Sequence, residues 1–183
     1  MNDQEVKERT NATVKMANVT QESASTVSEW MTSIWNNFDD CSKKLDYYAD
    51  VLTKLCASTA SSSEEIAEGV RKFAGISNTV GLSYEYAASA LATITATTRE
   101  SADVVGTALR TLFSRFQGLK LGETLEDGTT LNKYSEALKT AGVDIKTQSG
   151  ALKDMDTILD ELIEKWKTLN KDQQMALAQT MGG

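Results

Sequence analysis

Hydrophobic residues recur at three- and four-residue steps along most of the chain, which is the spacing of one face of an α-helix. Each run is short, and polar residues or glycine separate it from the next. The apolar runs cover residues 27–38, 48–55, 66–73, 84–94, 105–116 and 158–169. This pattern predicts a predominantly all-α fold of roughly eight or nine short helices, folded back on one another as hairpins in a compact bundle.

The runs differ in strength. The run over 158–169 has the clearest stripe, with Ile158, Leu162 and Trp166 in line, and we expect it to face the core. The first 19 residues carry a thinner stripe among charges, so they are predicted to be helical but weakly anchored. That thin stripe consists of Val6, Thr10, Val14 and Ala17.

Hydroxyl residues mark the predicted helix starts, because a serine or threonine side chain accepts a hydrogen bond from the first free amides of a helix. The candidate N-caps are Thr20, Ser62 or Ser63, Ser83 and Thr98. Two segments depart from the helical pattern. Residues 119–130 lack helical periodicity and are predicted to be an exposed loop, and residues 143–153 are predicted to form one small β-hairpin around a turn.

The chain also contains an internal similarity. The stretch TQESASTV at 20–27 aligns with TRESADVV at 98–105, a shift of 78 in the numbering. At half that shift, 39, the apolar positions of 49–55 fall on those of 88–94. Two helices in about 39 residues is the size of a helical-hairpin repeat. A chance match of two short amphipathic patterns is the alternative, and the shared polar start favours the repeat modestly.

Composition excludes several function classes. The chain has 183 residues and contains no proline and no histidine; 19 basic against 26 acidic side chains give a net charge of −7. We therefore expect no sequence-specific nucleic-acid binding, because phosphate backbones repel an acidic protein. The longest uncharged run, residues 86–98, is too short and too polar to span a bilayer, so no membrane span is expected. Cys41 and Cys56 are too few for a disulfide scaffold and are predicted to be reduced thiols.

The sequence contains few residues or motifs that could support catalysis or metal binding. Without histidine the commonest general base is missing, and no nucleophile elbow, phosphate-binding glycine loop or zinc spacing occurs. The acidic group Asp154, Asp156, Asp160 and Glu161 lacks the glycine and alternating oxygen ligands of a calcium loop. We interpret its first members as acids at a helix start, and Glu161 as the partner of Lys165 four residues later. The chain is predicted to be no enzyme, with no catalytic, cofactor-binding or metal-binding residues and no cofactor.

Three of the five arginines, Arg99, Arg110 and Arg115, lie close together in the sequence, in the part of the chain that is not net acidic. Arg99 and Arg110 are separated by about three turns of one predicted helix and would share a face. We consider these three arginines the candidates for contact with an acidic partner or a neighbouring subunit. The alternative is a solvated face that pairs with Glu100 and Asp103.

The second half of the chain resembles the phage tail tape measure protein family. The resemblance begins with GLSYE at 81–85, ALATI at 90–94 and TTRESADVVGTALRTLFSRF at 97–116. It continues through a helix over 132–139, AGVDI at 141–145, the turn at 149–150, MDTILDELIEKWKTL at 155–169 and DQQMALAQTMGG at 172–183. Residues 45–80 are similar to the preceding helices of the same region. The resemblance therefore divides the chain into N-terminal helices over 1–44, matched loosely, and a tape-measure-like helical domain over 45–183.

This resemblance implies a structural protein of a tailed phage, a prophage or a phage-tail-like particle. Members of the family act in tail assembly, tail-length determination and genome ejection. The implied partners are tail tube, baseplate and tail assembly chaperone proteins, with self-association as a further option. The implied locations are the lumen of the virion tail and, during assembly, the host bacterial cytoplasm. Family members are far longer, so we expect this chain to be a segment of a longer protein.

The predicted helices also indicate that this segment differs from the length-determining part of a tape measure protein, which we call the ruler. A ruler needs a long extended helix that gains about 1.5 Å per residue, whereas the short capped stripes here predict a folded module attached to one. Two alternatives remain at this point. One is a tail-associated envelope-degrading enzyme domain, which would need a positioned acid, base or metal. The other is a bacterial helical adaptor unrelated to phage.

Overall fold

The computed structural model describes residues 2–39, 43–59, 61–121 and 132–182. Over these residues the chain forms nine helices and no strand, so the predicted all-α fold of short helices is confirmed. The helices are α1 (Asp3–Thr20), α2 (Ala24–Phe38), α3 (Leu45–Ser58), α4 (Ser63–Val80), α5 (Tyr84–Thr98), α6 (Ala102–Leu121), α7 (Asn132–Thr140), α8 (Met155–Trp166) and α9 (Lys171–Gly182).

The helices belong to two compact units. The first unit contains residues 1–78 and 83–110, and the second contains residues 79–82 and 111–183. Helix α6 contributes its first half to the first unit and its second half to the second. The boundary expected after residue 44 falls between α2 and α3, inside the first unit, and it stays a prediction about which part matches the family loosely.

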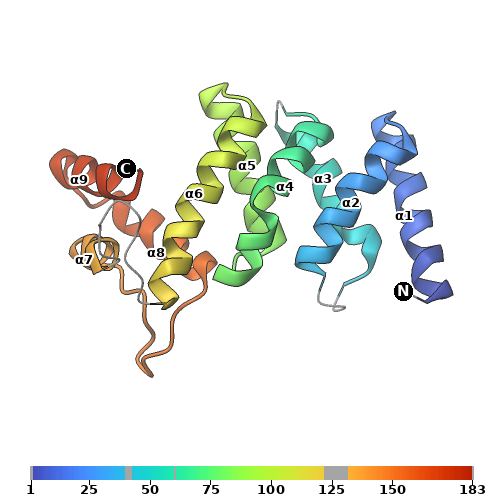
Figure 1. Ribbon diagram of the computed structural model, residues 1–183. Helices are drawn as coiled ribbons and strands as arrows, with labels where there is room; N and C mark the ends of the chain where they lie inside the picture. The colour runs from blue at the N-terminus through green and yellow to red at the C-terminus, as the bar shows by residue number, and fades with distance from the viewer. Residues whose placement is uncertain (1, 40–42, 60, 122–131, 183) are drawn as a thin grey trace. The chain divides into compact units, whose positions relative to one another are not determined.

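The 39-residue period is confirmed by the positions of the helices. Helices α2, α4 and α6 begin at Ala24, Ser63 and Ala102, so each start follows the previous one by one full period. Helices α3 and α5 begin at Leu45 and Tyr84, which are separated by the same period. The pairs α1–α2, α3–α4 and α5–α6 are therefore three successive copies of one helical hairpin, which we call hairpins 1, 2 and 3. In the first unit, α1 to α5 run as antiparallel neighbours (Figure 1).

The same turn closes the first helix of each hairpin. The hydroxyl of Thr20 donates to the Met16 carbonyl (2.9 Å) and accepts from the amide two residues on (3.4 Å). Thr98 repeats both bonds, at 2.8 and 3.2 Å, and so does Thr59, at 2.8 and 3.4 Å. Gln21 and Arg99, which follow Thr20 and Thr98, both adopt left-handed backbone, with φ of 61° and 64°. The similarity between residues 20–27 and 98–105 is therefore not a chance match, because the two segments form the same turn.

This turn also corrects two predicted caps. Thr20 and Thr98 are the last residues of α1 and α5, so they end one helix instead of starting the next. The N-caps are Ser23 and Ser101, whose hydroxyls accept from the amides three residues later at 3.1 and 3.3 Å. The caps predicted at 62 and 83 are confirmed, because Ser62 and Ser83 make the same bond at 3.1 and 3.3 Å.

The predicted stripes form the core of the repeat. Three positions of the second helix are buried in every hairpin: Val27, Ile66 and Val105; Met31, Val70 and Leu109; Trp35, Ala74 and Phe113. Aromatic residues join the hairpins of the first unit, since the Tyr84 hydroxyl donates to the Tyr48 carbonyl at 3.0 Å and their ring centroids lie 5.3 Å apart. Burial of each large apolar side chain in these stripes contributes about 1.5–3 kcal/mol relative to exposure.

Helices α4 and α6 approach each other through two glycines. A Cβ added at Gly106 would lie 2.6 Å from the Gly69 carbonyl oxygen, and one added at Gly69 would lie 3.0 Å from the Ala102 carbonyl oxygen. Both neighbours are backbone atoms, so rotation of a side chain cannot relieve either contact. This crossing therefore depends on the absence of side chains at both positions.

The second unit packs α7, α8 and α9 with the end of α6. The predicted hairpin is reduced to one antiparallel bridge, between Lys146 and Leu152, around a turn in which the Thr147 amide donates to the Ala151 carbonyl at 2.8 Å. Val143 and Ile145 on this segment are buried. Of the loop predicted over 119–130, residues 119–121 belong to α6, which corrects its start, and the rest lies outside the described residues.

Two stripes pack differently from expectation. In α8, Ile158 is buried, but Ile163 is 54% exposed and Trp166 is 37% exposed, so the clearest stripe faces the core at its start alone. In α1, Val6 and Val14 are 42% and 47% exposed. The buried face of α1 is instead Ala12, Thr13 and Met16. Amphipathic spacing identifies both helices correctly, but the neighbours of α1 cover a different face from the predicted one, and those of α8 cover the predicted face at its start alone.

Candidate interaction surfaces

The structure separates Arg99 from Arg110. Arg99 caps the C-terminal end of α5, before α6 begins, so the two residues do not share a helix and the predicted common face is wrong. Both side chains are exposed. Asp103, one of the two acids proposed to neutralise them, pairs with Lys72 of α4 at 2.5 Å. Contact of Arg99 or Arg110 with a partner stays a prediction.

Arg115 is engaged inside the second unit. Its Nη1 donates to the Met181 carbonyl at 2.6 Å, close to the end of α9. Its guanidinium carbon lies 5.8 Å from the centroid of the Tyr134 ring on α7. A half-buried cation at a helix C-terminus satisfies carbonyls that the helix itself leaves without partners. Arg115 therefore ties α6, α7 and α9 together, a role that its sequence position does not reveal.

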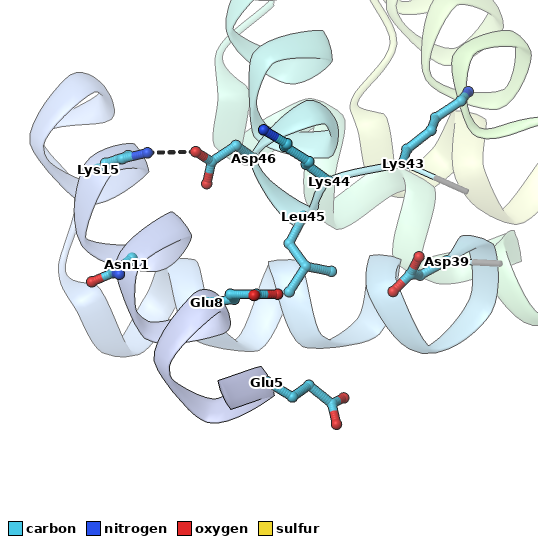
Figure 2. A pocket seen from close by; sticks show the side chains of 9 residues that line it. All are labelled: Glu5, Glu8, Asn11, Lys15, Asp39, Lys43, Lys44, Leu45 and Asp46. Atoms are coloured by element: carbon cyan, nitrogen blue, oxygen red, sulfur yellow. Dashed lines mark hydrogen bonds and ion pairs between the residues drawn. The ribbon is translucent and has the colours of Figure 1, made fainter. Parts of the chain in front are cut away.

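A polar groove of about 590 Å³ lies between α1 and the segment that leads into α3 (Figure 2). Its charged lining consists of Glu5, Glu8, Asp39 and Asp46 and of Lys15, Lys43 and Lys44. Lys15 forms an ion pair with Asp46 across the groove, which raises the pKa of Lys15 through the hydrogen bond and the charge of Asp46. Charges of both signs line an open surface here, so the groove selects for neither anions nor cations.

Lys43 of this groove also belongs to a small polar network with Tyr47 and Glu85. Lys43 and the Tyr47 hydroxyl both donate to the same carboxylate oxygen of Glu85 at the start of α5. Partial burial raises the pKa of Glu85, but the hydrogen bonds from Lys43 and Tyr47 outweigh it, so the net shift of the pKa is downward. The same contact raises the pKa of Lys43 and of Tyr47. The network fastens α3 to α5 and holds a carboxylate ionised, which is a structural role.

The second unit exposes apolar surface. A groove of about 260 Å³ between α7 and α9 is lined largely by small or aliphatic residues, among them Ala137, Ala141, Ala176 and Leu177. Ile163 and Trp166 of α8 and Met175 of α9 are exposed as well. The residues that line the groove are uncharged, which suits contact with another protein better than binding of a charged ligand.

Of the acidic residues near 154–161, Glu161 forms an ion pair within the second unit. Asp154 occupies the N-cap position of α8, although its side chain makes no capping bond. Glu161 pairs with Lys153 through both carboxylate oxygens, at 2.6 and 2.7 Å, so the expected pair with Lys165 is wrong. In the part of the chain that the structure describes, no group of three potential metal ligands comes together. Among those same residues, no helix is long and apolar enough to cross a bilayer.

Comparison with known proteins identifies the family of the chain. No solved structure matches it. A family model described as a phage-related minor tail protein matches residues 1–183, the whole length given. The repeated helical hairpins and the interaction surfaces described above are thus those of a member of the phage-related minor tail protein family.

Proposed function

We propose that this chain is a segment of a tape measure protein that acts in tail assembly, tail-length determination and genome ejection. The observation that carries the proposal is the match of a phage minor tail family over the whole sequence. The tape-measure-like segments between residues 81 and 183 support the finer assignment. Membership in a phage tail family also argues against an adaptor unrelated to phage.

Within such a protein, this segment acts as a folded module. The longest of its described helices, α6, has 20 residues, and the hairpins return the chain on itself. A segment of this kind adds little length to a ruler, but it offers surfaces to other tail components. Its partners are proposed to be tail tube, baseplate or tail assembly chaperone proteins, in the tail lumen or in the host cytoplasm before assembly ends.

An in-frame deletion of these residues in the parent phage distinguishes a folded module from a length-determining segment. An extended helix of this length would span roughly 270 Å, so removal of a ruler segment would shorten every tail by about that amount. We expect instead that the number of finished tails falls sharply, because a folded assembly module is missing. Tails shortened by the full helix length in normal number, measured by electron microscopy, would contradict the module, and normal infectious tails would contradict the whole proposal.

We further propose that the segment has no catalytic activity. The support is the lack of histidine and of nucleophile motifs in the sequence. Purified chain is expected to release no soluble fragments from peptidoglycan. Release that a single carboxylate substitution abolishes would establish an envelope-degrading enzyme instead.

A further inference from the structure

The outer side of hairpin 1 carries an open groove of about 490 Å³ between α1 and α2. Val6, Thr10 and Val14 of α1 and Ala24 and Ser28 of α2 line it, and all five are exposed. The buried ring of Trp35 lies at its base. Three of these residues belong to the stripe that the sequence predicts for the first helix, so this stripe is intact but uncovered.

The 39-residue register shows what covers the same positions elsewhere. The counterparts of the five groove residues are Leu45, Ala49, Thr53, Ser63 and Ala67 in hairpin 2, and Tyr84, Ala88, Ala92, Ala102 and Gly106 in hairpin 3. All five are buried in hairpin 3, and in hairpin 2 three are buried and two half-buried. Two other groove positions, those of Ser25 and Thr32, are exposed in all three hairpins. The change in burial is therefore confined to one face.

That face is covered by the preceding hairpin. Helix α1 contacts α3, and α3 contacts α5. The indole nitrogen of Trp35 in hairpin 1 donates to the Leu45 carbonyl at 3.3 Å, and the backbone of Gly69 in hairpin 2 touches Gly106. Leu45 and Gly106 are both groove-equivalent positions. Each hairpin thus presents the same face to the hairpin before it.

Hairpin 1 has residues of the same kind at the positions that form this interface in hairpins 2 and 3. Close approach of a neighbour requires small side chains, and three positions are small in every copy: Thr10, Ala49 and Ala88; Ala24, Ser63 and Ala102; Ser28, Ala67 and Gly106. The groove lining of hairpin 1 contains one charged residue, Arg9, which pairs with Glu5 at 3.1 Å. A face that ends a repeat array in water is normally polar. The polar residues of this groove are mostly serines and threonines, which are small, and Val6, Val14 and Ala24 remain apolar although they are exposed.

We propose that this face of α1 and α2 is a docking surface for one further helical hairpin of the same 39-residue repeat, packed as hairpin 1 packs on hairpin 2. The near-neutral lining disfavours a charged ligand, and the register specifies a repeat hairpin over an unrelated helix. The proposal does not rest on the proposed tail function.

The test extends the chain by one repeat. Residues 45–83 are placed directly ahead of Val6, so that Ser83 precedes Val6 as it precedes Tyr84 in the natural order. If the groove accepts a hairpin, the added residues unfold together with the first unit and raise Tm by about 5 °C or more, because repeat arrays gain stability from each neighbour interface. Hydrogen exchange of the α1 amides should slow at least about tenfold.

The matched control carries Val14→Glu and Ser28→Glu, which place charges in the groove. In the unextended chain both positions are exposed, so Tm should change by less than about 2 °C, whereas in the extended chain the gain in Tm and in protection should disappear. Equal losses in both chains would overturn the proposal, and so would an added hairpin that melts separately without changing α1. A dimer of the unextended chain that the two substitutions dissociate would also overturn it, by making a second copy the occupant.

Discussion

Helices α2 and α8 carry comparable apolar stripes, but the two stripes are buried to different extents. In α2, of the first unit, Val27, Trp30, Met31, Ile34 and Trp35 are all buried. In α8, of the second unit, burial is limited to Met155 and Ile158 at its start. The stripes have the same spacing, so the difference comes from the neighbours. Helix α2 packs against α1 and against α3 of the next hairpin and is buried from Val27 to Trp35, whereas the neighbours of α8 cover its start.

Matched substitutions in the two stripes should give the largest contrast. Ile34→Asp places a charge at a fully buried position of α2 and should cost about 4 kcal/mol or more, enough to unfold the first unit. Ile163→Asp in α8 should cost less than about 1 kcal/mol, because the side chain is already exposed. Thermal unfolding followed by circular dichroism measures both. Equal losses would show that α8 is covered in solution.

The glycine crossing of the first unit allows a second test. Gly106→Ala should lower the free energy of unfolding by about 1–3 kcal/mol, because its Cβ would meet a backbone carbonyl that cannot move away. Gly75→Ala, in an exposed part of α4 with its nearest neighbour 3.6 Å away, is the control and should gain about 0.5–1 kcal/mol. Chemical denaturation resolves the opposite signs, and a neutral Gly106→Ala would mean that α4 and α6 pack less closely.

The hydrogen bond of Arg115 allows a test in the second unit. Arg115→Met keeps much of the side-chain volume but removes the bond to the Met181 carbonyl, and it should cost about 1–2 kcal/mol. Arg71→Met in the first unit removes a weak exposed contact with Glu68 at 3.9 Å and should be neutral within about 0.5 kcal/mol. Hydrogen exchange in α9 should increase in the Arg115 variant alone. Unchanged exchange there would remove Arg115 from the architecture of the unit.

The smallest effect is expected at Glu85. Its pKa is lowered in the folded chain, so its ionised form contributes stability at neutral pH, and that contribution is lost as pH falls through the lowered pKa. Lys43 and Tyr47 have raised pKa values, so their contribution is present at neutral pH and is lost as strongly alkaline pH is reached. Glu85→Gln should cost less than about 1 kcal/mol at neutral pH, because the pair is partly exposed to solvent. The difference from the unsubstituted chain should vanish toward about pH 3 in acid titrations; a difference that grows in acid would reverse the assigned shift.

These contrasts mark what the sequence predicts and where prediction fails. The 39-residue period and the buried stripes of α2, α4 and α6 are predictable, because one face of each helix meets the same kind of neighbour. The caps predicted at Thr20 and Thr98 are wrong, because a threonine that closes a turn and a serine that starts a helix are both hydroxyl residues three positions apart. The left-handed backbone at Gln21 and Arg99 could not be predicted, because neither residue is a glycine.

The interaction surfaces are harder to predict than the fold. The bond from Arg115 to Met181 joins residues 66 positions apart, and no local pattern encodes it. The prediction of one helix for Arg99 and Arg110 fails because it starts that helix three residues too early. The exposed residues of α1 and α8 show that helical spacing predicts which residues share a face, whereas the neighbours of the helix decide whether that face is buried.

The threonine turn has a genetic consequence. Each turn is closed by hydrogen bonds within a few residues of its own threonine, so every repeat encodes its own turn geometry. Gain or loss of 39 codons leaves every remaining stripe in register, whereas gain or loss of one or two residues inside a helix rotates the rest of that helix and turns its apolar face away from the neighbouring hairpin. Whole hairpins are therefore the units in which a gene of this kind can lengthen or shorten and still encode a folded protein.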